Sequence, residues 1–287
     1  MRIFVAGATG VCGWRATREL VKAGHEVTGL ARSDHKAKLL DGLGAKPVSF
    51  DVFDAADVKA HVAGHDVVVN LLTHIPKMAK AAIPGVWKEN NRLREEVSAH
   101  LAAASDGRII QESITFPYGD HGDEWLTEDA EQRDPRYLAG VSAAESNALA
   151  QEGGVVLRFA QFYSPDSHHT IDQVKYAKRG VMSMPGKADG YWTLLHADDV
   201  ATAVVAALKA PTGVYNVAED EPMTRREAGL ILAGLLGKKK LRHLLRPVPL
   251  LNSSQRVSNA KFKQATGWAP SVPSQREGWP MILKEMA

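Results

Sequence analysis

The sequence predicts an α/β protein with a doubly wound parallel sheet and a smaller C-terminal substrate-binding lobe. Two observations predict it. Short runs that are apolar along their whole length alternate with helical patterns through the first two thirds of the chain, which is typical of parallel strands buried on both faces. The last third differs, because residues 164–195 are rich in Ser, His, Gly and Pro, and helical patterns dominate from Met223 onward.

Strands and helices are expected in alternation. The strand patterns cover residues 2–6, 26–30, 46–50, 66–71, 108–111, 155–159 and 213–217. The helical patterns cover residues 11–21, 34–43, 55–63, 87–104, 137–151 and 197–208. We expect residues 1–158 with 190–212 to form the nucleotide-binding domain, and residues 159–189 with 213–287 to form the lobe. A ligand cleft is expected between the two parts, at the carboxyl ends of the strands.

Composition excludes several classes of function. The 287 residues are 45% hydrophobic and 24% charged, as in an ordinary globular enzyme and unlike a disordered, collagen-like or disulfide-stabilised chain. The formal net charge of +2 gives no reason to expect a nucleic acid or a membrane as partner. The single cysteine, Cys12, cannot form an internal disulfide, and no targeting segment is evident. A cytoplasmic monomer or homodimer with a small-molecule substrate is expected.

A glycine-rich turn directly follows the first strand. Gly7, Gly10 and Gly13 stand between that strand and the first helix, as in a Rossmann-type dinucleotide-binding turn. The first glycine permits the tight turn, the second lets the backbone approach a pyrophosphate, and the third allows helix and strand to pack closely. With Thr9 and Val11 of the same turn, these residues are predicted to hold the cofactor phosphates at the helix N-terminus.

The end of the second strand indicates which dinucleotide is bound. NAD-binding sheets carry an acidic residue there, about 20 residues past the glycines, which takes the ribose hydroxyls. This chain has Arg32 and Ser33 instead, with no carboxylate before Asp34. A guanidinium donates two parallel hydrogen bonds to a phosphate, and the Ser33 hydroxyl adds a donor. NADP(H) is therefore the expected cofactor, with NAD(H) as the alternative.

Further motifs follow the glycine turn in order. They are Asp51-Val52, Asn70-Leu71-Leu72, residues 157–165, residues 196–201, residues 213–217, residues 256–259 and residues 267–270. Together they closely resemble the short-chain dehydrogenase/reductase superfamily, in particular its extended, epimerase/dehydratase-like branch, over nearly the whole chain. The resemblance implies that Asp51 and Val52 contact the adenine and that Leu71 and Leu72 run under the cofactor.

The chain departs from the catalytic residues that the resemblance implies. The superfamily places a Ser or Thr after the fifth strand and a Tyr-x-x-x-Lys pattern on the next helix. Aligned through Glu145, the tyrosine position holds Tyr137 and the lysine position holds Val141. The usual serine position falls on Ile114, so the hydroxyls on either side, of Ser113 and Thr115, are the candidates.

The missing lysine has a chemical consequence. In the family its charge lowers the phenol pKa from about 10. Without it a tyrosine is protonated at neutral pH, which suits proton donation to a carbonyl and not proton removal from an alcohol. Tyr137 is the first candidate donor and Tyr118 the second. Tyr163 and His168 are expected to face the substrate, and no metal site is predicted.

The leading hypothesis is an NADP(H)-dependent oxidoreductase that reduces the carbonyl of a small organic substrate. One alternative is an epimerase, a dehydratase or another enzyme without net hydride transfer, in which the bound cofactor is regenerated or structural. The other is a non-catalytic NADP-binding redox sensor. The absent lysine favours these alternatives, and the hydroxyl-rich segment after the fifth strand favours an enzyme. The substrate depends on irregular loops, from which the sequence does not name it.

Overall fold

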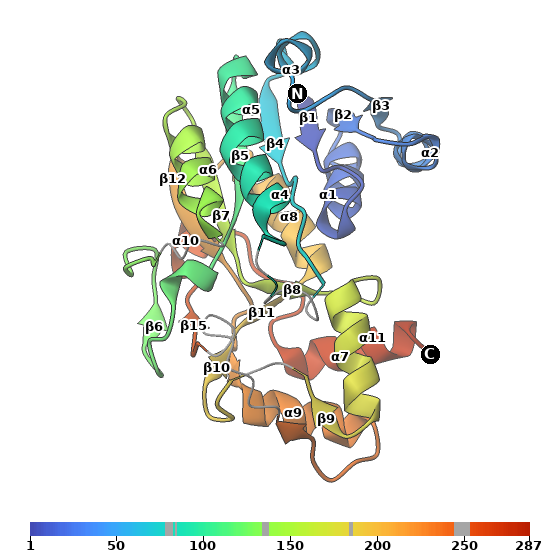
Figure 1. Cartoon of the computed structure of the whole chain (residues 1–287), viewed down its shortest axis with the longest axis vertical. Helices are drawn as coiled ribbons and strands as arrows, with labels where there is room; N and C mark the ends of the chain where they lie inside the picture. Colours follow the sequence, from blue (N-terminus) through green and yellow to red (C-terminus); the bar gives the residue numbers. More distant parts are fainter. Residues whose placement is uncertain (78–82, 84, 134–137, 184–185, 244–252) are drawn as a thin grey trace.

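Seven parallel strands form the central sheet of the computed structural model shown in Figure 1. The structure describes residues 1–77, 83, 85–133, 138–183, 186–243 and 253–287. The strands are β1 (Arg2–Ala6), β2 (Glu26–Leu30), β3 (Lys46–Val48), β4 (Val67–Asn70), β5 (Arg108–Ile114), β7 (Val155–Phe159) and β12 (Gly213–Val217). Their order is β12-β7-β5-β4-β1-β2-β3, and each neighbouring pair is parallel. The winding reverses between β1 and β4, so the predicted Rossmann-type sheet is confirmed.

Helices cover both faces of this sheet. On one face α1 packs against α8, and on the other α5 packs against α3 and α6. Side chains of β1 alternate between the two cores, with Ile3 in one and Phe4 in the other, both fully buried. The helices are α1 (Val11–Lys22), α2 (Asp34–Gly42), α3 (Ala55–Val62), α5 (Ser98–Ala104), α6 (Gly140–Leu149) and α8 (Ala197–Ala207). This double burial is the reason that most residues of the central strands are apolar.

The helical stretch before β5 contains a π-helical turn. It runs as α4 (Lys88–Arg92), η2 (Leu93–Val97) and α5, where the sequence predicts one helix over residues 87–104. Such turns are rare and are frequent at functional sites. This one carries Arg94, whose side chain is 1% exposed.

A smaller lobe lies at the carboxyl ends of the strands, and Figure 1 shows α7, α9 and α11 gathered there with the C-terminus. Its core includes Tyr163, Trp192 and Trp279. Its helices are α7 (His168–Lys178), α9 (Arg225–Leu235) and α11 (Gln275–Glu285), and its short strands are β8 (Gln161–Tyr163), β9 (Val181–Met182), β10 (Tyr191–Trp192), β11 (Leu194–His196), β13 (Met223–Thr224) and β14 (Arg242–His243). No helix in the described ranges is both long and apolar enough to cross a bilayer.

Two features of the lobe differ from the prediction. Residues 168–178 form a helix, although their sequence shows little periodicity. The periodicity is weak because only a narrow stripe of the helix, which includes Val174 and Ala177, is buried. The strand Gly213–Val217, which we assigned to the lobe, is the edge of the central sheet and pairs with β7. It is covered by α10 (Ala260–Thr266), and Phe262 of that helix contacts Tyr215. The short strands β6 (Trp125–Leu126) and β15 (Arg256–Val257) pair outside the central sheet, and their Leu126 and Val257 are buried in its first core.

Candidate active site

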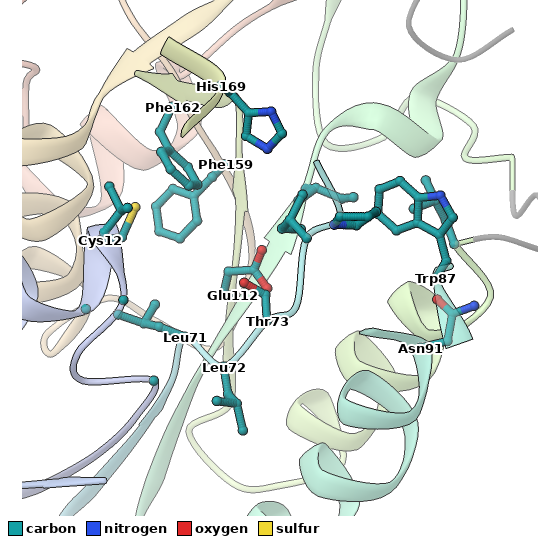
Figure 2. A pocket seen from close by; sticks show the side chains of 18 of the residues that line it. Cys12, Leu71, Leu72, Thr73, Trp87, Asn91, Glu112, Phe159, Phe162 and His169 are labelled. Carbon is teal, nitrogen blue, oxygen red and sulfur yellow. The ribbon is translucent and has the colours of Figure 1, made fainter. Parts of the chain in front are cut away.

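A cavity of about 1290 Å³ opens at the carboxyl ends of β1, β4, β5 and β7 and extends to the first turn of α7. Figure 2 shows it from close by. Residues of the glycine turn line one end, and His168 and His169 line the other. The cavity therefore lies where the sequence predicts the cleft, across the point at which the sheet's winding reverses.

The glycine turn fits a diphosphate. Gly7 has φ +79°, and a Cβ on it would lie 2.6 Å from the Leu71 carbonyl carbon. A Cβ on Gly13 would lie 1.9 Å from the Gly7 oxygen. A Cβ on Gly10 would meet only the Gly7 oxygen, at 3.4 Å, so it would occupy otherwise open space. Gly10 caps α1 without a side-chain hydrogen bond, and the first turn holds no acid, so this helix N-terminus is open to an anion.

Two cations line the next part of the cavity. Arg32, at the end of β2, and Lys36, on the first turn of α2, are the charged lining residues here. Lys36 was not singled out from the sequence, although its position four residues after Arg32 could have indicated it. Between residues 30 and 52, all of them described, no carboxylate lines the cavity.

Three predicted cofactor residues have other contacts. The Ser33 hydroxyl caps α2 by accepting from the Lys36 amide at 3.4 Å. Asp51 accepts from the Phe53 amide at 2.9 Å, and Val52 is 8% exposed within the core. These side chains are not among the described residues that line the cavity. Leu71 and Leu72, by contrast, do line it, as the resemblance implies.

A buried network occupies two of the predicted catalytic hydroxyls. Ser113 donates to a Glu145 oxygen at 2.5 Å. Tyr118 donates to Asn216 at 2.7 Å and accepts from Arg158 at 2.9 Å, and burial raises the pKa of its phenol. Both side chains are fully buried. The expectation that either faces a ligand is therefore corrected, because their strand and turn direct them into the interior.

Thr115 is the remaining hydroxyl of this segment. It lines the cavity, and its Oγ1 lies 3.5 Å from Oε1 of Gln255. Tyr137 lies outside the described residues. Val141, at the position of the expected lysine, is fully buried in α6, so α6 supplies no cation at this point.

The two predicted substrate residues lie in different environments. His168 lines the cavity at the start of α7 together with His169. Burial lowers the pKa of His169, which favours its neutral imidazole. Tyr163 is 1% exposed and packs against His196 and Trp279, with ring centroids 5.5 and 5.3 Å apart. It supports the lobe and is not among the described lining residues.

A carboxylate on the cavity floor was missed from the sequence. Glu112 of β5 lines the cavity, and both of its oxygens accept hydrogen bonds from Nη2 of Arg94 at 2.8 Å. Burial raises the pKa of Glu112, and Arg94 opposes that rise. Acidic residues are seldom buried unless paired, so a glutamate inside an apolar strand is a signal that the sequence did contain.

Beyond the glycine turn, the cavity is lined by both apolar and charged side chains. The apolar ones include Ile75, Pro76, Ile83, Trp87, Phe116, Leu138, Phe159 and Phe162, and the charged ones include Lys77, Lys88, Arg92, Glu95 and Glu96. Trp87 and Phe162 are labelled in Figure 2 on opposite sides of the cavity. The apolar side chains suit an apolar or aromatic ligand, and the polar and charged groups would orient it. No group of three or more metal-ligating side chains occurs in the described part of the chain.

A doubly wound sheet with an open helix N-terminus inside a large cleft defines a class of dinucleotide-dependent enzymes. The chain belongs to the NAD-dependent epimerase/dehydratase family, whose model matches residues 3–218. It is an NAD(P)-dependent enzyme of that family.

Relatives within this class include named reductases. The chain is 32% identical to the 3-diazoavenalumate denitrifying reductase of a Streptomyces species, over 97% of this chain and 99% of that protein. It is 25% identical to the 2-alkyl-3-oxoalkanoate reductase of Shewanella oneidensis, over 77% of this chain and 62% of that protein. Its fold is similar to that of Bacillus cereus UDP-glucuronic acid 4-epimerase in complex with UDP-glucuronic acid and NAD, with a TM-score of 0.82, 19% identity and full coverage of both chains.

Proposed function

We propose that this chain is an NADPH-dependent reductase of a small, largely apolar organic acceptor. The observation that carries the proposal is the pair Arg32 and Lys36, which line the cavity where a 2′-phosphate would lie. A dianionic phosphate gains charge-assisted hydrogen bonds from both side chains. No carboxylate from residues 30–52 lines this part of the cavity to take a free ribose hydroxyl pair, so NADH would lack its usual partner.

The chain's own residues have distinct roles in the proposal. The bound cofactor supplies a hydride. The N-terminus of α1 holds the diphosphate, and Leu71 and Leu72 support the cofactor from below. Thr115 would hydrogen-bond the acceptor oxygen, because Thr115 lines the cavity and its hydroxyl's contact with Gln255 is long, at 3.5 Å. Tyr137 is proposed as the proton donor from its alignment through Glu145.

A second acceptor class is favoured by one observation. The position of the family's lysine holds the buried Val141. An acceptor that takes up hydride without a proton would not need that lysine. A diazonium group is such an acceptor: hydride forms a new C–H bond, the C–N bond breaks, and dinitrogen leaves with its electron pair. The relative with 32% identity is named as a denitrifying reductase of a diazo compound, which supports this candidate.

Spectrophotometry at the NADPH absorbance tests both acceptors. Purified protein is given NADPH or NADH with an aromatic aldehyde, a 3-oxo ester or an aryldiazonium salt, and products are identified by mass spectrometry. The proposal expects faster oxidation of NADPH than of NADH with at least one acceptor. Cofactor that survives desalting and is never consumed would instead indicate an epimerase-like enzyme. Exchangeable NADP without turnover of any acceptor would indicate a sensor.

A further inference from the structure

Glu112 lies on β5, two strands away from β1, which ends in the glycine turn. The register Asn70 to Gln111 between β4 and β5 places Glu112 in line with Leu71, the next residue after β4. The cavity runs from the glycine turn across Leu71 to Glu112, and Figure 2 shows the carboxylate directed into it. A dinucleotide that crosses the sheet with its adenosine near Arg32 would bring its second ribose over this part of the floor.

Arg94 holds this carboxylate in one orientation. Its Nη2 donates to both Glu112 oxygens at 2.8 Å, and the two side chains are 1% and 13% exposed. Its Nε and Nη1 have no hydrogen-bond partner in the described part of the chain, so Glu112 is the group that fixes the guanidinium. A Cβ on Gly140 would lie 2.8 Å from the Cβ of Arg94, so a glycine is needed for α6 to pack here.

The pair is not explained by stability alone. A buried ion pair of this kind is often no more stable than an apolar pair of similar volume, because both charges lose their hydration. The cation of the pair, Arg94, lies on η2. The position on α6 at which the resemblance implies a lysine is instead the buried Val141. Of this pair, the Glu112 carboxylate lines the cavity, and Arg94 is not among the described lining residues.

We propose that Glu112, oriented by Arg94, accepts hydrogen bonds from the hydroxyls of the nicotinamide ribose and so positions the reactive half of the cofactor. Carboxylates bind vicinal ribose hydroxyls in the adenosine half of NAD sites, and a hydrogen bond to a charged acceptor is strong. Glu112 is a positioning residue in this proposal, because it acts on the ribose and not on the reacting carbon. The inference rests on the proposed function only for the choice of NADP as the probe.

Calorimetry with two ligands tests the proposal without a substrate. NADP⁺ contains the nicotinamide ribose, and 2′,5′-ADP lacks it while keeping the groups that Arg32 and Lys36 would bind. In Glu112→Gln, NADP⁺ should bind about tenfold more weakly or worse, and 2′,5′-ADP should bind within twofold of wild type. Glu152→Gln is the matched control, since Glu152 is exposed and is not among the described residues that line the cavity. It should change neither affinity.

Glu112→Gln leaves Arg94 without its charged partner, and this variant can fail to fold for that reason alone. A second variant is therefore tested in parallel. The double variant Arg94→Met with Glu112→Leu removes both buried charges and should show the same selective loss of NADP⁺ affinity. Equal losses for NADP⁺ and 2′,5′-ADP, or no loss for either, would overturn the role of Glu112. If 2′,5′-ADP binds wild type no better than ADP, the NADP preference fails instead, and the comparison is repeated with NAD⁺ and ADP.

Discussion

Removal of the Arg32 guanidinium is the most direct perturbation of the proposed cofactor preference. Arg32 is exposed and Lys36 half-buried, and both line the same end of the cavity. A hydrogen bond to a charged group is worth about 1.5–3 kcal/mol, and solvent exposure places this one near the lower value. Arg32→Ala should therefore weaken NADPH binding about tenfold and leave NADH binding within about twofold, because NADH has no 2′-phosphate.

The double variant Arg32→Ala with Lys36→Ala should bind NADPH more weakly than Arg32→Ala alone. The fold-loss of affinity should be smaller than the product of the two single-variant losses, because both cations would contact one phosphate. Isothermal titration calorimetry at low and high salt is the assay, and the NADPH advantage should shrink as salt screens these exposed charges. Lys38→Ala is the control, since Lys38 is exposed on the same helix and is not among the described lining residues. Equal affinity of wild type for the two cofactors, or equal weakening of both in Arg32→Ala, would refute the reasoning.

Three further outcomes are expected. Gly10→Val should fold normally, because Gly10 has φ −75° and open space at its Cβ, yet lose dinucleotide binding in calorimetry; normal NADPH affinity would contradict the phosphate site. Tyr118→Phe should unfold more easily by about 1–3 kcal/mol, since it leaves buried partners unpaired, with kcat nearly unchanged; a selective collapse of kcat would return Tyr118 to catalysis. Burial raises the pKa of Glu219 to about 8, so the folded state retains a proton that the unfolded state loses first, and stability should fall as pH rises from about 4.5 to 8. Glu219→Gln stays neutral and should show a flatter melting temperature over that range; parallel pH profiles would argue against a neutral Glu219.

Much of the fold was predictable because its signals are local. Most residues of the central strands are apolar, and β1, β2 and β3 are each followed by a helix after a short loop. This alternation by itself indicates a parallel sheet. The signal of the glycine turn is also local, because the positive φ of Gly7 and the close approach of Gly13 to the Gly7 oxygen involve residues near one another in the sequence. Arg32 could be placed because it lies two residues after the second strand.

The direction of side chains on β5 could not be predicted from the sequence. Successive residues of a strand point to opposite faces, but on a strand buried on both faces the apolar pattern does not tell which face meets the cavity. The sequence therefore does not separate Ser113 from its neighbours. The structure turns Ser113 toward Glu145, and Glu112 lines the cavity.

Contacts between distant segments were decided only by the tertiary structure. The sequence by itself determined the sheet, the glycine turn after the first strand, the cationic end of the second strand and the absence of the family's lysine at Val141. Packing decided that Tyr118 is enclosed by Arg158 and Asn216, and that Arg94 reaches Glu112 from a π-helical turn. The physical reason is that local backbone preference depends on near neighbours, whereas the partner of a buried polar group depends on which elements meet around it.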